Sequence, residues 1–235
     1  MKSGKVYLIP VNIADETQSS VLAPSLKEVL PSIKYFLVEN VRTARRYLSS
    51  LKIYPSIEEL QFEELSKDTD PSSISALLQP VIDGANVGVM SESGCPGIAD
   101  PGSLAVDYAH KHNLTVVPMV GPSSLVLALM SSGLNGQRFA FHGYLPIESK
   151  ELSQSIRDYE KESKQKRQTQ MFIETPYRNN AIMSALLRSL HDSTYLCVAV
   201  DLTGKNESIK TRTVKEWKSV KIDFPKLPAV FLFLA

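Results

Sequence analysis

The sequence predicts an α/β protein with two domains, and three observations support this. Short apolar runs rich in β-branched and aromatic residues alternate with segments of helical spacing along the chain. The 235 residues are enough for one large domain or two small ones. The balance of 43% hydrophobic and 22% charged residues is ordinary for a globular protein. No run approaches the roughly 18 apolar residues of a membrane span, so we expect a soluble intracellular protein.

In the first half, the regular alternation of strands and helices predicts a parallel sheet. The expected strands are residues 6–9, 34–38, 62–65, 85–90 and 114–119. The expected helices are residues 24–30, 41–51, 104–112 and 123–132, with a further one that runs from Pro71 to Ile82. Pro10 stops the first strand, and Asn40 can cap the helix that follows it. Residues 11–20 are expected to form a polar loop.

In the second half the strands follow one another more directly, which allows antiparallel pairing. The expected strands are residues 139–145, 171–174, 195–200, 207–211 and 229–234. The expected helices are residues 149–169, 177–190 and 214–220. We place the domain boundary near Gly121, which gives domains of residues 1–120 and 121–235. A cleft between two such α/β domains is where we expect a ligand to bind.

Charge and cysteine content exclude several classes of protein. Lys and Arg number 26 and Asp and Glu number 25, a net charge of +1, so any contact with nucleic acid must come from a local patch. Two cysteines, Cys95 and Cys197, cannot form a disulfide framework, which suits the cytoplasm. The four histidines are scattered, and we therefore expect no metal site.

The segment SESGCPGIADPG, residues 91–102, is the most informative loop. It follows a buried strand and precedes a helix, so it lies at the carboxyl end of a parallel sheet, where α/β proteins bind ligands. Its glycines let the backbone approach a ligand and its prolines stiffen the path. An ordinary strand-to-helix turn is the alternative. Cys95 lies in this loop, and a small residue in a tight loop explains it more readily than a nucleophile does.

Two further segments have polar side chains that could bind a ligand. In GPSS, residues 121–124, Ser123 and Ser124 lie at a helix N-terminus and could hold a carboxylate or a ribose, or could simply cap their own helix. In VRTARRYL, residues 41–48, Arg42, Arg45 and Arg46 share one helical face. That face is either a phosphate-contacting patch or a solvated surface. A GxGxxG fingerprint and a P-loop are both absent from the sequence.

Taken in order, the motifs resemble the tetrapyrrole methylase superfamily of S-adenosylmethionine (SAM)-dependent methyltransferases. Within it they are most similar to the branch of the rRNA (cytidine-2′-O)-methyltransferases. The segments that carry the resemblance are VYLIPVN, VENVRTARRYL, SESGCPGIADPG, VVPMVGPSSLVLALMSSGL, QRFAFHGYLP and MFIETPYR. They cover essentially the whole length, in the family order. The resemblance implies two α/β domains with SAM in the cleft between them, and a cytoplasmic homodimer.

The resemblance also implies which residues contact SAM. They come from the loops after the first strand and after the strand at residues 85–90, from GPSS, and from the second domain: Pro10, Ser93, Gly94, Cys95, Ile98, Ser123, Ser124, Glu174, Leu202, Pro228 and Ala229. Backbone amides and small residues at these positions suit an adenosine and a methionine moiety. No metal is implied.

The implied reaction is methylation of a ribose 2′-oxygen of cytidine in 16S rRNA. Among the carboxylates near the expected cleft, Glu39 is the first candidate for the general base, ahead of Glu92 and Asp100. Glu39 could instead be a structural partner of Arg42, and Asp100 a helix cap. The RNA phosphates are expected on Arg42, Arg45, Arg46 and Arg178.

Departures from the family motifs keep two other functions open. The PVNIAD loop lacks the family glycine, the VENVR segment lacks an Asp and a Thr, and Glu92 and Cys95 replace an Asp and a Thr. A methyltransferase acting on a small molecule such as a tetrapyrrole is one alternative, which the near-neutral charge favours. A SAM-binding relative without catalysis is the other. Gly94 and Pro96, which shape the expected cofactor loop, are retained.

Overall fold

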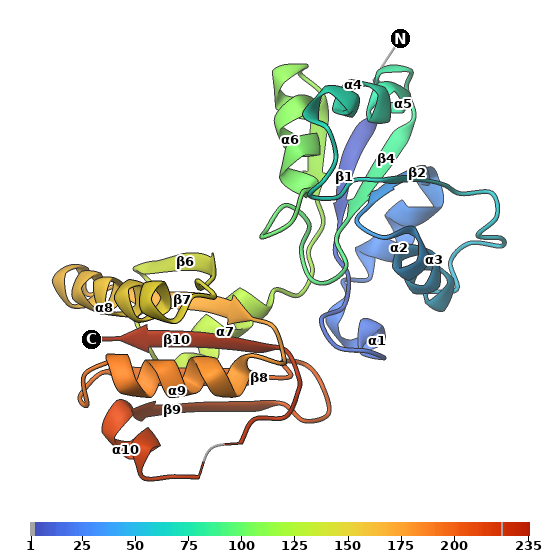
Figure 1. The fold of residues 1–235 in the computed structure, drawn as a ribbon. Helices are drawn as coiled ribbons and strands as arrows, with labels where there is room; N and C mark the ends of the chain where they lie inside the picture. The colour runs from blue at the N-terminus through green and yellow to red at the C-terminus, as the bar shows by residue number, and fades with distance from the viewer. Residues whose placement is uncertain (1–2, 222) are drawn as a thin grey trace. The chain divides into compact units, whose positions relative to one another are not determined.

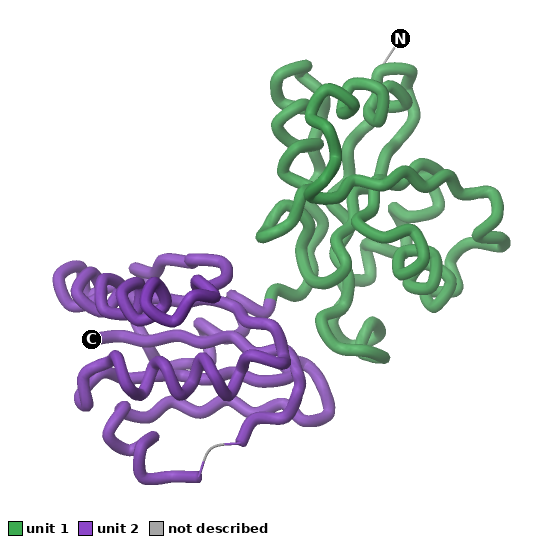
Figure 2. Tube along the Cα trace, viewed as in Figure 1, with its two compact units in different colours: residues 1–123 green, residues 124–235 purple. Residues whose placement is uncertain are grey.

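The computed structural model describes residues 3–221 and 223–235 and confirms the α/β prediction (Figure 1). The chain divides into two compact units, unit 1 of residues 1–123 and unit 2 of residues 124–235 (Figure 2). This division falls three residues after the boundary expected from the sequence. Each unit is built on its own five-stranded sheet. In the part of the chain that the structure describes, no helix has the length and apolar character to cross a membrane.

Unit 1 holds the parallel sheet that the alternating pattern predicts. Its strands are β1 Lys5–Ile9, β2 Ile33–Val38, β3 Gln61–Glu64, β4 Asn86–Met90 and β5 Thr115–Pro118. They lie in the order β3-β2-β4-β1-β5, and every pairing is parallel. Parallel strands place their carboxyl ends at one edge of the sheet. The segments that follow β1, β4 and β5 therefore begin side by side.

Helices cover both faces of this sheet. They are α1 Gln18–Val21, α2 Ser25–Val29, α3 Val41–Ser50, α4 Ile74–Leu77, α5 Gln79–Ile82 and α6 Gly102–Lys111, with 3₁₀ turns at Leu30–Ser32 and Pro71–Ser73. The Asn40 side chain accepts hydrogen bonds from the backbone N–H groups of Arg42 and Thr43, the cap expected for α3. Phe36 and Val38 pack in one core cluster and Leu37 in another, as the two-residue period of a strand requires.

Two sequence predictions for unit 1 were wrong in detail. The helix expected from Pro71 to Ile82 is divided into a 3₁₀ turn, α4 and α5. Pro80 lies at the start of α5 and has no N–H to continue the hydrogen bonds of α4, so the helix breaks there. The segment expected as a polar loop, residues 11–20, includes the start of the short helix α1.

Unit 2 has a mixed sheet. Its strands are β6 Phe139–Tyr144, β7 Thr169–Glu174, β8 Tyr195–Val200, β9 Ser208–Thr213 and β10 Ala229–Leu234, in the order β6-β7-β10-β8-β9. Only the pair β6–β7 is parallel among these described strands. The helices are α7 Ser124–Ser132, α8 Ser149–Lys166, α9 Asn179–Ser189 and α10 Val214–Lys218. The other three pairs, β7–β10, β10–β8 and β8–β9, are antiparallel, as the direct succession of strands in the sequence predicts.

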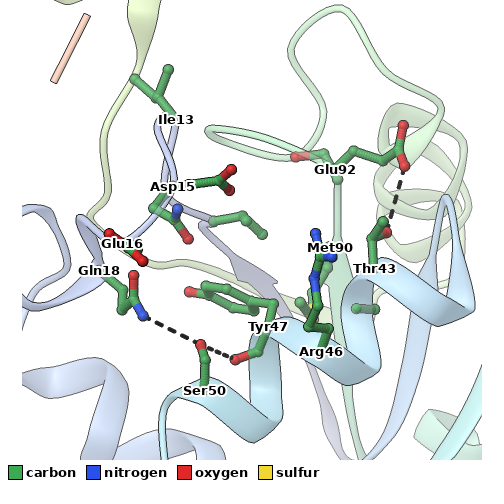
Figure 3. A pocket seen from close by; sticks show the side chains of 14 residues that line it. Ile13, Asp15, Glu16, Gln18, Thr43, Arg46, Tyr47, Ser50, Met90 and Glu92 are labelled. Carbon is green, nitrogen blue, oxygen red and sulfur yellow. Dashed lines mark hydrogen bonds between the residues drawn. The ribbon is translucent and has the colours of Figure 1, made fainter. Parts of the chain in front are cut away.

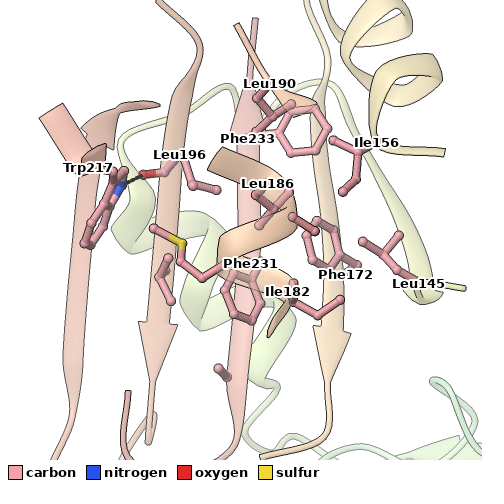
Figure 4. Close-up of a cluster of buried hydrophobic side chains, with 14 of the residues drawn as sticks. Leu145, Ile156, Phe172, Ile182, Leu186, Leu190, Leu196, Trp217, Phe231 and Phe233 are labelled. Atoms are coloured by element: carbon pink, nitrogen blue, oxygen red, sulfur yellow. Dashed lines mark hydrogen bonds between the residues drawn. The ribbon is translucent and has the colours of Figure 1, made fainter. Parts of the chain in front are cut away.

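The core of unit 2 lies on both faces of its sheet. On one face, Phe172 and Phe231 stack with ring centroids 5.5 Å apart beneath Ile182 and Leu186 of α9 (Figure 4). On the other face α7 packs against a second apolar cluster. The helix expected at residues 149–169 is shorter, because Arg167 adopts a left-handed conformation (φ 50°) that ends α8 and lets β7 begin.

Candidate functional site

In unit 1 the loops after β1, β4 and β5 are joined to one another. The backbones of Val11 and Gly94 exchange two hydrogen bonds of 2.8 and 3.1 Å. The Cys95 thiol donates to the Pro122 carbonyl at 3.3 Å. Gly121 packs so closely on Pro10 that an added Cβ would lie 2.0 Å from the proline Cβ. The structure therefore brings Pro10, Gly94, Cys95 and the GPSS segment together at the carboxyl edge of the sheet.

The shape of the Gly-rich loop depends on Asp100. The Gly97 N–H donates to both carboxylate oxygens at 2.8 and 2.9 Å, and the Gly102 N–H donates to Oδ1 at 2.7 Å. Asp100 thus holds the loop and the first turn of α6, which agrees with its structural interpretation. Gly94 has a φ of 75°, a conformation that favours glycine. Within this loop Ser93 is exposed and Ile98 is 50% exposed, so both are accessible to a ligand.

Glu39 lies beside two carboxylates of this loop, those of Glu92 and Asp100. One oxygen of Glu39 accepts a hydrogen bond from the Glu92 backbone N–H at 2.7 Å, rather than pairing with Arg42. Burial raises the pKa of Glu39, the hydrogen bond from Glu92 opposes that shift, and the negative charges of Asp100 and Glu92 add to it. A carboxylate whose pKa is raised by burial and like charges is better suited to accept a proton than an ordinary glutamate.

A pocket of about 600 Å³ opens next to the joined loops, within unit 1 (Figure 3). Its walls come from residues 11–18, from α3 and from the turn after β4. Tyr47 of α3 forms part of the wall, and its hydroxyl donates to the Pro10 carbonyl at 2.8 Å. Glu92 and Arg46 also line it, so the pocket holds charges of both signs. Sequence reasoning missed Tyr47 and Gln18, because a lone polar group on an apolar helix face or in a polar segment gives no signal of its own.

The three arginines of α3 have different surroundings. Arg45 pairs with Glu58 at 2.7 Å, and its guanidinium lies 5.6 Å from the centroid of the Phe62 ring. Arg46 lines the pocket, and Arg42 is exposed. A shared helical face therefore does not give them one environment. Arg46 and Arg42 are better placed than Arg45 to meet a phosphate.

This difference predicts unequal effects on stability for two matched substitutions. Arg45→Ala should lower the free energy of unfolding by about 1 kcal/mol, because it removes a partly exposed ion pair and a cation–π contact. Arg46→Ala should change it by less than about 0.5 kcal/mol, as surface substitutions usually do. Urea unfolding of both variants measures this. Equal losses of stability would contradict the assigned environments.

In unit 2 the predicted residues meet at one edge of the sheet. Ala229 pairs with Glu174 on one side and with Val200 on the other. The Asp201 N–H donates to the Pro228 carbonyl at 2.9 Å, which holds the segment of Leu202 beside β10. The ends of β7 and β8 and the start of β10 thus place Glu174, Leu202, Pro228 and Ala229 together.

Glu174 is a buried carboxylate with one satisfied oxygen. Its Oε1 accepts from the backbone N–H and the hydroxyl of Thr175, at 2.7 and 3.2 Å. Its Oε2 lies 3.4 Å from Nη1 of Arg178 but has no hydrogen-bond partner among the described residues, and the buried Thr203 hydroxyl also lacks one. Arg178 is itself held by the Pro146 carbonyl at 3.1 Å. Buried polar atoms usually have partners, so this edge suits a ligand that offers hydrogen-bond donors and acceptors.

No group of three or more His, Cys, Asp and Glu side chains in the described residues is arranged to hold a metal ion. The residues gathered at each of the two edges, taken separately, suit contact with an organic ligand. Their common features are backbone amides, small side chains and a few buried polar groups, which is the usual make-up of a cofactor pocket.

Comparison with curated proteins finds ribosomal RNA methyltransferases among the relatives of this chain. No family model matches the chain. It is 28% identical over 216 residues to ribosomal RNA small subunit methyltransferase I of Escherichia coli O157:H7, which covers 91% of this chain and 70% of the relative. The protein of the same name from Synechocystis is 28% identical, covering 90% of this chain and 72% of that one.

The fold is shared with solved structures of more distant sequence. The methyltransferase CobJ aligns with a TM-score of 0.62 at 14% identity, covering 98% of this chain and 94% of the other. A uroporphyrin-III-C-methyltransferase from Thermus thermophilus aligns with a TM-score of 0.54 at 16% identity, covering 100% and 93%. At these identities the likeness establishes the fold.

Proposed function

We propose that this chain, which is similar to the ribosomal RNA small subunit methyltransferases I and shares its fold with two solved methyltransferases, is a SAM-dependent methyltransferase of the tetrapyrrole methylase superfamily that acts on RNA of the small ribosomal subunit. The finer proposal is methylation of a ribose 2′-oxygen of a cytidine in 16S rRNA. The observation that supports this proposal is the junction of the loops after β1, β4 and β5 at the carboxyl edge of the sheet, beside an open pocket. We also propose a cytoplasmic homodimer, on the resemblance alone.

The residues present fit SAM. In unit 1, Gly94 leaves space where the loops meet, since an added Cβ would only touch the Pro122 carbonyl at 3.6 Å. In unit 2, Glu174 Oε2 has the ion-pair contact with Arg178 but no hydrogen-bond partner among the described residues, so it can accept a hydrogen bond from a ribose hydroxyl or an amine. The proposed contacts are those of the sequence prediction: Pro10, Ser93, Gly94, Cys95, Ile98 and Ser123 in unit 1, and Ser124, Glu174, Leu202, Pro228 and Ala229 in unit 2.

When bound, SAM supplies an electrophilic methyl group, and the protein's contribution is to align the acceptor oxygen with it. Alignment of this kind can supply roughly 7–11 kcal/mol of a barrier. We propose that the acceptor binds in the pocket beside the loops, because Val11 both lines this pocket and pairs with Gly94 of the Gly-rich loop.

Glu39 is the proposed base for the ribose hydroxyl. Arg42 and Arg46 are the proposed phosphate contacts, and Arg45 and Arg178 stay proposals of lower rank because each has a protein partner.

Titration calorimetry with SAM and with S-adenosylhomocysteine tests the cofactor site directly. We expect micromolar binding of both. Transfer of a radiolabelled methyl group to small ribosomal subunits, taken from a strain that lacks this protein, then tests the substrate. Transfer that weakens steeply as the salt concentration rises supports RNA, whereas transfer to a tetrapyrrole that is insensitive to salt would overturn it. Binding of SAM without any transfer would identify a non-catalytic relative.

A further inference from the structure

The two units carry charges of opposite sign. Unit 2 has 16 Lys and Arg residues against 11 Asp and Glu, a net charge of +5 with neutral His. Unit 1 has 10 against 14, a net charge of −4. The total of +1 conceals this asymmetry. The net charge of unit 2 therefore attracts a polyanion such as RNA, whereas in unit 1 only local cations such as Arg42 and Arg46 attract it.

Large apolar side chains are exposed at one edge of the unit 2 sheet. Tyr144 ends β6 and is 59% exposed, Ile147 follows three residues later at 84%, and Tyr177 follows the end of β7 at 82%. The parallel strands β6 and β7 end at the same edge, and Tyr144 is in register with Ile173. We call the exposed side chains of Tyr144, Ile147 and Tyr177, at the end of the sheet where β6 and β7 finish, the edge platform. Glu174 and Ala229 meet at the same end of the sheet.

Cationic groups accompany these side chains. The Lys226 ammonium lies 5.4 Å from the centroid of the Tyr177 ring. Arg178 follows Tyr177 directly and binds the Pro146 carbonyl, which ties the turn of Tyr177 to the segment that carries Ile147. Aromatic side chains with adjoining cations are the features by which proteins hold unstacked single-stranded nucleic acid, because every base has a face that can stack.

We propose that the edge platform binds unstacked nucleotides of the substrate RNA, with Lys226 meeting the backbone. This inference rests on the proposed function for its substrate but uses residues that the sequence motifs did not assign. The net charge of +5 on unit 2, with the Lys226 ammonium beside the Tyr177 ring, favours a polyanion as the occupant. The occupant is thus a single-stranded segment of RNA.

The test uses the full chain and two readouts. Tyr177→Ala, and separately Ile147→Ser, should raise the KM for small ribosomal subunits roughly tenfold while leaving SAM affinity unchanged. They should also weaken binding of a fluorescent single-stranded oligouridine by a similar factor. Tyr195→Ala is the matched control, because Tyr195 is 53% exposed but begins β8 at the opposite edge of the same sheet. Lys226→Ala should lower the slope of the salt dependence by about one.

The outcomes separate this inference from the proposed function. If the unchanged chain methylates ribosomal subunits and Tyr177→Ala behaves like Tyr195→Ala in both readouts, the edge platform does not bind RNA. If Tyr177→Ala converts a dimer to a monomer in sedimentation without changing oligouridine binding, a second copy is the occupant and the inference is wrong. If the unchanged chain methylates no subunit, the proposed function fails, and the oligouridine readout still decides whether the platform binds RNA.

Discussion

Gly94→Trp should abolish binding of SAM and S-adenosylhomocysteine while leaving the protein folded. We expect the dissociation constant to rise at least 100-fold, a loss of about 2.7 kcal/mol. The first side-chain atom fits, since a Cβ would lie 3.6 Å from the Pro122 carbonyl, an ordinary contact. The indole beyond it would occupy the space where the loops after β1, β4 and β5 meet. Titration calorimetry measures the loss.

The matched control is Gly133→Trp. Gly133 has a φ of 71°, close to the 75° of Gly94, so both substitutions carry the same backbone strain. Nothing lies within 4 Å of a Cβ at Gly133, which follows the end of α7. Both variants should lose similar stability in urea unfolding, but only Gly94→Trp should lose the ligand. Retained micromolar binding by Gly94→Trp would show that SAM does not occupy these loops.

The sequence predicted what depends on local periodicity. Strand alternation fixed the parallel sheet of unit 1, and Asn40 marked the start of α3. The prediction from the sequence was wrong where a single residue interrupts a hydrophobic pattern that otherwise continues. Pro80 divides an apolar helical face whose Ile74, Leu78 and Val81 are still buried together, so the hydrophobic spacing was right and the continuous helix was wrong.

The candidate site shows the same limit. The motif resemblance named Pro10, Gly94 and Ser123, but the bonds that join these loops link residues far apart in sequence. Glu39 and the Glu92 N–H are 53 positions apart, and the Tyr47 hydroxyl and the Pro10 carbonyl are 37 apart. Neither pairing has a local signal. The separate environments of Arg45 and Arg46 likewise depend on Glu58 and Phe62, which only the fold brings to α3.

Glu39→Gln should lower the rate of methyl transfer to ribosomal subunits by roughly 10²–10⁴-fold, the contribution of a general base. The amide keeps the shape of the carboxyl group, and its oxygen can still accept the Glu92 N–H, so SAM affinity and the fold should be preserved. A single-turnover assay with saturating SAM isolates the chemical step from binding. Full activity of the variant would remove Glu39 from the reaction and leave it as a support for the turn after β4.

The pH dependence gives an independent check on the same residue. Burial raises the pKa of Glu39, so the rate should fall on acidification at a higher pH than for an ordinary glutamate, because only the ionised form accepts a proton.

The free energy of unfolding should change with pH in the opposite direction from the rate, falling as the pH rises. An acid whose pKa is higher in the folded state binds its proton more readily there, so the folded state loses stability as the pH rises through that pKa. Glu39→Gln cannot ionise, and its urea unfolding should lack this loss. If the free energy of unfolding of the wild-type protein and of Glu39→Gln changed equally from pH 4 to 7, the pKa of Glu39 would not be raised. The reason for preferring Glu39 as the base would then be lost.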